Sequence, residues 1–248
     1  MTSRLFTSAI MHSATSMNLW ALSRKAKKLA FSVAKTFLIT STNSSIVVAA
    51  LRNVEYKQLQ TIAFVTFTAF TLDDALAGLN YGPVIEPDYD GALFVNKSEE
   101  LLSQGGFHRI PTIMGFTSNE ASAFGDIPRI IMLALTGNDL EPQKYAPVDL
   151  TNKSSDRLAA GVKIKMHYFG LIGAIVASRF VSDDQFNRPI RKAVLDQSKY
   201  APVYCYEFSY EGLLGGVKDR MYPGVGHAED IGYLFRTYNI TRSKKMNW

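Results

Sequence analysis

The sequence predicts an α/β protein in which helices flank a partial central sheet. Three short apolar runs have the composition of buried strands, and they cover residues 5–12, 111–116 and 203–209. Longer stretches with helical periodicity separate the strands or lie between them, most clearly at 154–180 and 184–199. Strands that alternate with long helical stretches are typical of an α/β sheet.

Composition and charge restrict the class of protein and its partners. The 248 residues are 47% hydrophobic and 20% charged, which is typical of a globular protein and excludes a disordered tail, a collagen-like rod or a coiled coil. The net charge of +5 is concentrated in residues 1–54, which hold seven Lys and Arg and no Asp or Glu. The rest of the chain holds 20 basic against 22 acidic residues, so we expect no nucleic-acid partner.

The first predicted helix spans 20–38. Its apolar positions follow helical spacing and are Ala26, Leu29, Ala30, Val33, Ala34 and Phe37. An acid-free, Ser-rich start is also typical of a mitochondrial transit peptide, so periodicity alone leaves two interpretations. Residues 44–62 predict two further short helices, a loop follows at 81–88, and a short helix is expected at 231–235.

Several features bear on the cellular setting. The longest apolar runs, such as 170–177, are too short to span a membrane, and the polar start does not resemble a signal peptide. The single cysteine, Cys205, lies in an apolar run and is expected to be a buried core thiol. The aromatic residues of 62–70 and 204–210 are likewise expected in the core, and contact with an apolar substrate is the alternative. Four N-x-S/T sequons permit a glycoprotein that is secreted or enters the ER lumen, at Asn43, Asn96, Asn152 and Asn239.

Few residues are candidates for chemistry. The sequence contains no G-x-S-x-G, P-loop, G-x-G-x-x-G or zinc signature, and we expect no metal or organic cofactor. Of the four histidines, His167 lies in a predicted helix and is expected to be structural. His108 is expected in an exposed loop, and His12 ends the first predicted strand.

His227 is the strongest of these candidates. It lies in a Gly-rich turn at 223–230, just before an apolar helix, where a loop can carry an imidazole beyond the rim of a sheet. An imidazole takes and returns protons near neutral pH, which suits a general base. A histidine at the start of a helix with no chemical role remains the alternative.

Glu120 is its candidate partner. It follows the predicted strand at 111–116, so its carboxylate could orient a histidine on a neighbouring loop and stabilise the imidazolium. Alternatively, it caps the next helix. An acid that precedes a histidine, each on a loop after a strand, is the chain order of α/β-hydrolases.

Seven segments in order resemble the type-B carboxylesterases, the family of insect juvenile-hormone esterases and cholinesterases. The segments lie at 1–13, 20–23, 83–87, 113–120, 182–189, 202–208 and 224–235. The match runs almost from end to end, so a folded strand and helix become the better interpretation of residues 1–54. The resemblance implies that residues 1–248 form the C-terminal portion of a single α/β-hydrolase domain, with a partial central sheet.

The resemblance also implies roles for individual residues. Glu120 corresponds to the acid and His227 to the base of a Ser–Glu–His triad that hydrolyses carboxylic esters without a cofactor. Ser13 and Asp230 correspond to residues that would buttress the histidine. Alternatively, Glu229 and Asp230 only place favourable negative charge at a helix N-terminus.

The nucleophile is the main departure from the family. We expect the serine elbow and the Gly-rich segment of the oxyanion hole to belong to an N-terminal half that these residues do not include. Neither Ser13 nor Ser118 has the elbow pattern. The chain alone is therefore expected to be inactive, and a strand that lost its neighbour would become an edge with an uncovered apolar row. The alternatives are a non-catalytic, esterase-like adhesion protein and a non-functional truncated product.

Overall fold

A computed structural model describes the protein at residues 5–62, 82–125, 141–150, 153–169, 174–217, 220 and 222–236. Three parallel strands form its sheet in the order β1-β2-β3: β1 (Ala9–His12), β2 (Thr112–Thr117) and β3 (Val203–Phe208). The predicted strands are therefore confirmed, although the first is shorter than expected. Pairing of β1 begins opposite Thr112, directly after Pro111, which has no N–H with which to extend the ladder.

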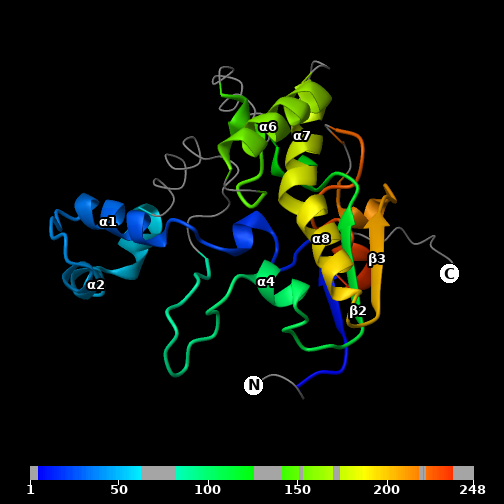
Figure 1. Cartoon of the computed structure of the whole chain (residues 1–248). Helices are drawn as coiled ribbons and strands as arrows, with labels where there is room; N and C mark the ends of the chain where they lie inside the picture. The colour runs from blue at the N-terminus through cyan, green and yellow to red at the C-terminus, as the bar shows by residue number, and fades with distance from the viewer. Residues whose placement is uncertain are drawn as a thin grey trace.

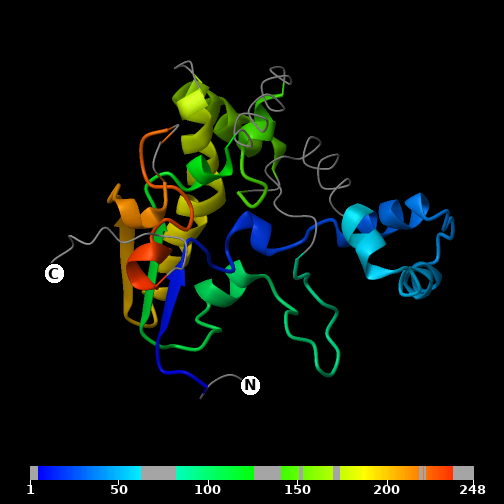
Figure 2. The same ribbon diagram turned by 180° about the vertical axis from the view of Figure 1, so that it is seen from behind.

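One face of the sheet is covered by α8 (Arg188–Gln197), as Figure 1 shows. Met114 and Phe116 of β2 are buried there against Ile190 and Ala193 of the helix. The short helix α9 (Ile231–Leu234) lies on the opposite side and is seen from behind in Figure 2. The sheet, α8 and α9 thus form the layers that hold the candidate site.

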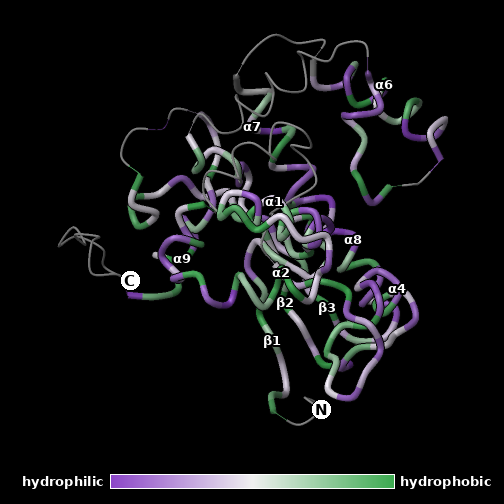
Figure 3. The backbone as a smooth tube through the Cα atoms, turned by 90° about the vertical axis from the view of Figure 1, so that its left-hand side faces the viewer, coloured by the Kyte–Doolittle hydropathy of each residue, from purple (hydrophilic) through white to green (hydrophobic). Residues whose placement is uncertain are grey.

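The remaining helices confirm most of the expected elements. They are α1 (Ala26–Thr36), α2 (Ser44–Leu51), a helix at 56–62, α4 (Ser98–Ser103), α6 (Ser154–Phe169) and α7 (Ala174–Ser182). A π-helical turn (Asp183–Asn187) joins α7 to α8. Figure 3 shows the three strands together, with α6 well apart from them. Within the described part of the chain, no helix is long and apolar enough to cross a membrane.

The helix predicted at 20–38 begins later than expected. A 3-10 turn (Leu19–Ala21) precedes it, and the Arg24 guanidinium donates to the Leu19 carbonyl at 2.6 Å, which holds the chain in a bend before α1. The expected apolar stripe is confirmed, because Leu29, Val33 and Ala34 are buried. Together α1 and α2 project to one side of the sheet (Figures 1 and 2).

The prediction of a buried thiol is wrong. Cys205 is exposed, and so are Tyr204 and Tyr210, at 65% each. The reason is position: among the described residues β3 pairs only with β2, and an edge strand has no neighbour to cover its outer side. The aromatic segment at 62–70 lies, apart from Ile62, outside the described residues.

An apolar row crosses the face of the sheet opposite α8. Ile10, Ile113 and Tyr204 are in register across the three strands, and their exposed fractions are 62%, 39% and 65%. Side chains on one face of a sheet recur every second residue, so the next row along the strands is His12, Gly115 and Tyr206. This second row lies at the carboxyl end of the sheet, where the candidate site is found.

Candidate active site

Glu120 and His227 meet at the carboxyl edge of the sheet. Glu120 opens the 3-10 turn (Glu120–Phe124) that follows β2, and His227 lies in the loop between β3 and α9. Because parallel strands end at the same edge, loops after neighbouring strands converge there. The Glu120 Oε2 atom lies 2.7 Å from the His227 Nδ1 atom.

The Glu120 carboxylate is fully buried and both of its oxygens are bound. Oε1 accepts a hydrogen bond from the Thr117 backbone N–H at 2.8 Å, while Oε2 faces the imidazole. The His227 backbone N–H also donates to the Glu120 carbonyl, at 3.0 Å. The carboxylate therefore binds the preceding strand and the histidine, and not the turn that it begins.

The environment of His227 favours a protonated ring. The hydrogen bond to Glu120 raises the pKa of His227, the negative charges of Glu120 and Asp230 raise it further, and partial burial opposes them. The side chain keeps 37% of its accessible surface, so a reactant can reach it. With Nδ1 bound to Glu120, Nε2 is the ring nitrogen left to accept a proton from a hydroxyl.

Hydrogen bonds join the Glu120 turn to the His227 loop. Asn119 donates from its backbone to the Val225 carbonyl at 2.9 Å and from its amide to the Pro223 carbonyl at 2.9 Å. The Ser118 hydroxyl accepts from the Val225 N–H at 2.9 Å. Gly224 has φ +99°, and a Cβ there would lie 2.8 Å from the Asn119 Cβ, so the close approach requires glycine.

A partly buried ion pair between Arg220 and Glu229 braces the histidine loop. The Arg220 guanidinium binds both oxygens of Glu229, at 2.8 and 2.5 Å, and also donates to the Gly224 carbonyl at 3.0 Å. Glu229 in turn accepts from the Gly226 N–H at 2.6 Å. A bidentate pair of this kind is strongly directional. Glu229 therefore holds the backbone beside His227 through specific hydrogen bonds, in addition to placing negative charge at the start of a helix.

Asp230 is buried, and its nearest polar neighbours come from the sheet. Its Oδ2 atom lies 2.8 Å from His12 Nδ1 and 3.4 Å from the Tyr206 hydroxyl. Ser13 is also buried, with φ 57°, and its backbone N–H donates to the Gly115 carbonyl. The contact to Asp230 thus comes from His12, the residue before Ser13.

Aromatic rings line one side of the imidazole. The ring centroids of Phe124 and Phe186 lie 5.6 and 5.4 Å from that of His227, and the Trp20 ring lies 5.8 Å from Phe186. Apolar walls exclude water and strengthen the charge interactions of the pair.

The other histidines lie elsewhere. His167 is exposed on α6 and contacts the Tyr168 ring, and His108 is half-buried beside Phe6 in an irregular segment. Within the described ranges, no three His, Cys, Asp or Glu side chains gather closely enough to hold a metal ion. Of the sequons, Asn43 caps α2 and Asn96 is exposed, whereas Asn152 and Asn239 lie outside the described residues.

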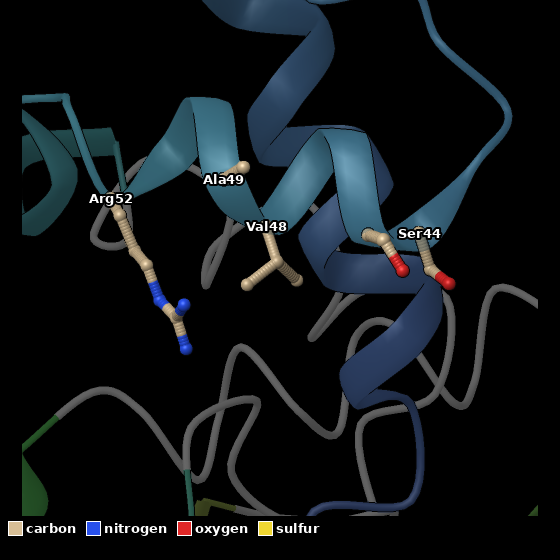
Figure 4. Close-up of a pocket in the computed structure, with 5 residues that line it drawn as sticks. Ser44, Val48, Ala49 and Arg52 are labelled. Atoms are coloured by element: carbon tan, nitrogen blue, oxygen red, sulfur yellow. The ribbon is translucent and has the colours of Figure 1, made fainter.

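One hollow away from the sheet has no histidine or carboxylate in its lining. It has a volume of about 310 Å³, lies against α2 and is lined by Ser44, Ser45, Val48, Ala49 and Arg52 (Figure 4). Its hydroxyls have no histidine or carboxylate among the lining residues to accept a proton. This hollow therefore lacks the histidine–carboxylate pair found at the carboxyl edge of the sheet.

Sequence reasoning missed the residues that support the pair. Asn119, Tyr206 and His12 carry no motif, because their contacts join residues that are 104 to 218 positions apart. Arg220 also carries no motif, and it binds Glu229 nine residues further along the chain. One signal was present for His12: it ends a predicted strand, and ends of parallel strands meet at one edge.

Comparison with known proteins agrees with the fold. Residues 1–247 match the model of the carboxylesterase family. Juvenile hormone esterase from Heliothis virescens is 27% identical over 174 residues, which are 65% of this chain and 30% of that protein. The crystal structure of juvenile hormone esterase from Manduca sexta, with OTFP covalently attached, superposes with a TM-score of 0.75 at 23% identity. The match covers 94% of this chain and 45% of the solved one, so this chain spans less than half the length of both relatives. With its three-stranded parallel sheet and flanking helices, the chain has an α/β-hydrolase architecture and belongs to the carboxylesterase family.

Proposed function

We propose that Glu120 and His227 are the acid and the base of a Ser–Glu–His esterase site for small-molecule carboxylic esters. The observation that supports the proposal best is the 2.7 Å contact between Glu120 Oε2 and His227 Nδ1. In this mechanism His227 takes the proton of an attacking hydroxyl and returns it to the leaving group. Glu120 holds the ring in the productive tautomer and stabilises the imidazolium.

We further propose that the hydroxyl and most of the oxyanion hole belong to polypeptide outside these 248 residues. The sequence contains no G-x-S-x-G, and the Ser118 hydroxyl is bound to the histidine loop through Val225. Residues 1–248 would then form the C-terminal portion of one hydrolase domain. Loss of one triad member lowers the rate by roughly four orders of magnitude, so the chain alone should show no ester turnover above background.

Two assays test this function. The purified chain is incubated with p-nitrophenyl acetate and with a fluorophosphonate, and neither turnover nor labelling is expected. Stoichiometric labelling of a serine, lost in His227→Ala, would overturn the assignment of the nucleophile to other polypeptide.

The second assay adds a separately produced N-terminal portion of a carboxylesterase that carries the elbow. In the assembled protein, fluorophosphonate labelling should appear and should fall at least about a thousandfold in rate in both Glu120→Gln and His227→Gln. Glu207→Gln, on the exposed edge strand, serves as the control. A labelling rate that is unchanged in both Glu120→Gln and His227→Gln would show that these residues are not the acid and the base.

A further inference from the structure

A second histidine–carboxylate contact lies beside the first. His12 Nδ1 is 2.8 Å from Asp230 Oδ2, and the Tyr206 hydroxyl is 2.7 Å from the same ring nitrogen. These residues come from β1, β3 and the start of α9, so segments more than 190 residues apart meet at one point. The triad does not use this cluster directly.

The strand register explains how the cluster forms. His12, Gly115 and Tyr206 occupy one row across the sheet. Gly115 has no side chain, and a Cβ at that position would lie 2.1 Å from the Tyr206 ring. The phenol therefore crosses the central strand and packs edge-on to the His12 ring, with centroids 5.8 Å apart.

Hydrogen positions in the cluster follow from its chemistry. If His12 Nδ1 lacked a proton, its lone pair would face the Asp230 carboxylate at 2.8 Å, which is repulsive. His12 Nδ1 therefore donates to Asp230 Oδ2. Burial and the charge of Asp230 raise the pKa of Tyr206, so the phenol keeps its proton at neutral pH and can donate to the same carboxylate.

The Asp230 carboxylate also lies close in sequence to His227, and its second oxygen differs from the first. Oδ1 is buried and accepts no hydrogen bond from the described residues, so within them the carboxylate is held through Oδ2 alone, by His12 and Tyr206. Asp230 lies three residues after His227, and its charge contributes to the raised pKa of that ring. We propose that His12 and Tyr206 are positioning residues that hold the Asp230 carboxylate where its charge stabilises the protonated His227 ring.

Among the described residues, the charges that act on His227 are those of Glu120 and Asp230. His227 faces Glu120 from the turn after β2, together with Asp230 and the uncharged rings of Phe124 and Phe186. Asp230 faces His12 and Tyr206. The adjacent Glu229 is neutralised by Arg220. A change in the His227 titration can therefore be traced to Glu120 or to the Asp230 cluster.

The test is an NMR titration of the His227 ring in the full chain, with the four histidines assigned by substitution. Asp230→Asn should lower the pKa of His227 because it removes a negative charge. His12→Leu and Tyr206→Phe should lower it less, because the carboxylate remains but loses a donor. His12→Asn, whose amide can occupy the place of Nδ1, should restore the wild-type value.

Glu207→Gln is the matched control, since it removes one negative charge from the strand position next to Tyr206 on the opposite face. An unchanged His227 titration in Asp230→Asn would overturn the proposal. The pKa of His227 could instead fall in Asp230→Asn but stay the same or rise in both His12→Leu and Tyr206→Phe. That result would show that His12 and Tyr206 do not position the carboxylate. Tyr206→Phe deletes one oxygen and keeps the ring over Gly115, so it remains informative if His12→Leu does not fold.

The proposal rests on the proposed function for its purpose, but its test does not. The titration is measured without substrate and without a nucleophile, whereas the esterase assays measure labelling. If the assembled protein shows no labelling but the pKa of His227 falls in the variants as expected, the electrostatic coupling stands and the esterase function does not. A positive esterase assay with a negative titration would reject only the role of His12 and Tyr206.

Discussion

The two faces of the three-stranded sheet are organised differently. On the face under α8, Met114 and Phe116 are almost completely buried by apolar side chains of the same chain. On the other face, Ile10 and Tyr204 are largely exposed, while His12 and Tyr206 at the carboxyl end are joined to Asp230 by hydrogen bonds. The polar groups beside the candidate site are thus held by directional hydrogen bonds, whereas the apolar row of Ile10, Ile113 and Tyr204 has no cover among the described residues.

The largest expected effect lies on the covered face. Phe116→Ala should lower the free energy of unfolding by about 3–5 kcal/mol, because it removes a large buried ring and leaves a cavity under α8. Tyr204→Ala, on the open face, should change it by less than about 0.5 kcal/mol. Urea unfolding followed by far-UV circular dichroism measures both. Equal losses would show that the open face is packed in solution.

The next effect tests the polar end of the open face. Gly115→Ala should cost about 1–3 kcal/mol, since its Cβ would meet the Tyr206 ring and displace it. Gly82→Ala is the control, because a Cβ there would be in ordinary contact at 3.7 Å. If Gly115→Ala unfolds at the same urea concentration as Gly82→Ala, Tyr206 does not cross the central strand.

Asp184 is a buried carboxyl group in the π-helical turn that precedes α8. Burial raises the pKa of Asp184 to about 6, even though Arg188 beside it acts in the opposite direction. A raised carboxyl pKa means that the folded state binds the proton more tightly, so stability falls as pH rises from about 4 through about 6. Asp184→Asn should remove this fall, of up to about 3 kcal/mol, in unfolding curves measured between pH 4 and 7.5. A curve as steep as that of the wild type would contradict the assignment.

The smallest effect belongs to the candidate site. Because the folded-state pKa of His227 is raised, the protonated ring stabilises the fold fully below its ordinary value of 6.5. That contribution is lost as pH rises through the raised value. His227→Gln should therefore flatten the pH dependence of stability in this window and leave it unchanged in the Asp184 window. A steeper dependence would show that the ring is held neutral.

Sequence alone predicted the elements whose pattern is local. Two of the three strands lie close to the expected bounds, and the stripe of α1 follows simple periodicity. The pairing of Glu120 with His227 could be anticipated because both follow strands of one parallel sheet. Bounds that depend on a neighbour were less accurate: β1 starts at Ala9 because Pro111 ends the ladder.

Contacts across the fold could not be predicted. Cys205 was placed in the core on apolar composition, but β3 is an edge strand among the described residues. The His12–Asp230 contact depends on register across three strands and on a glycine in the middle one. No local pattern contains that information, since the residues are up to 218 positions apart.

The most direct test of the central claim is the titration of His227 itself. The account predicts that its ring, followed by NMR in the full chain, titrates above 6.5 and that Glu120→Gln lowers the pKa because the hydrogen-bonded carboxylate is gone. A His227 ring that titrates identically with and without the Glu120 charge would contradict the pairing on which the proposed esterase site depends.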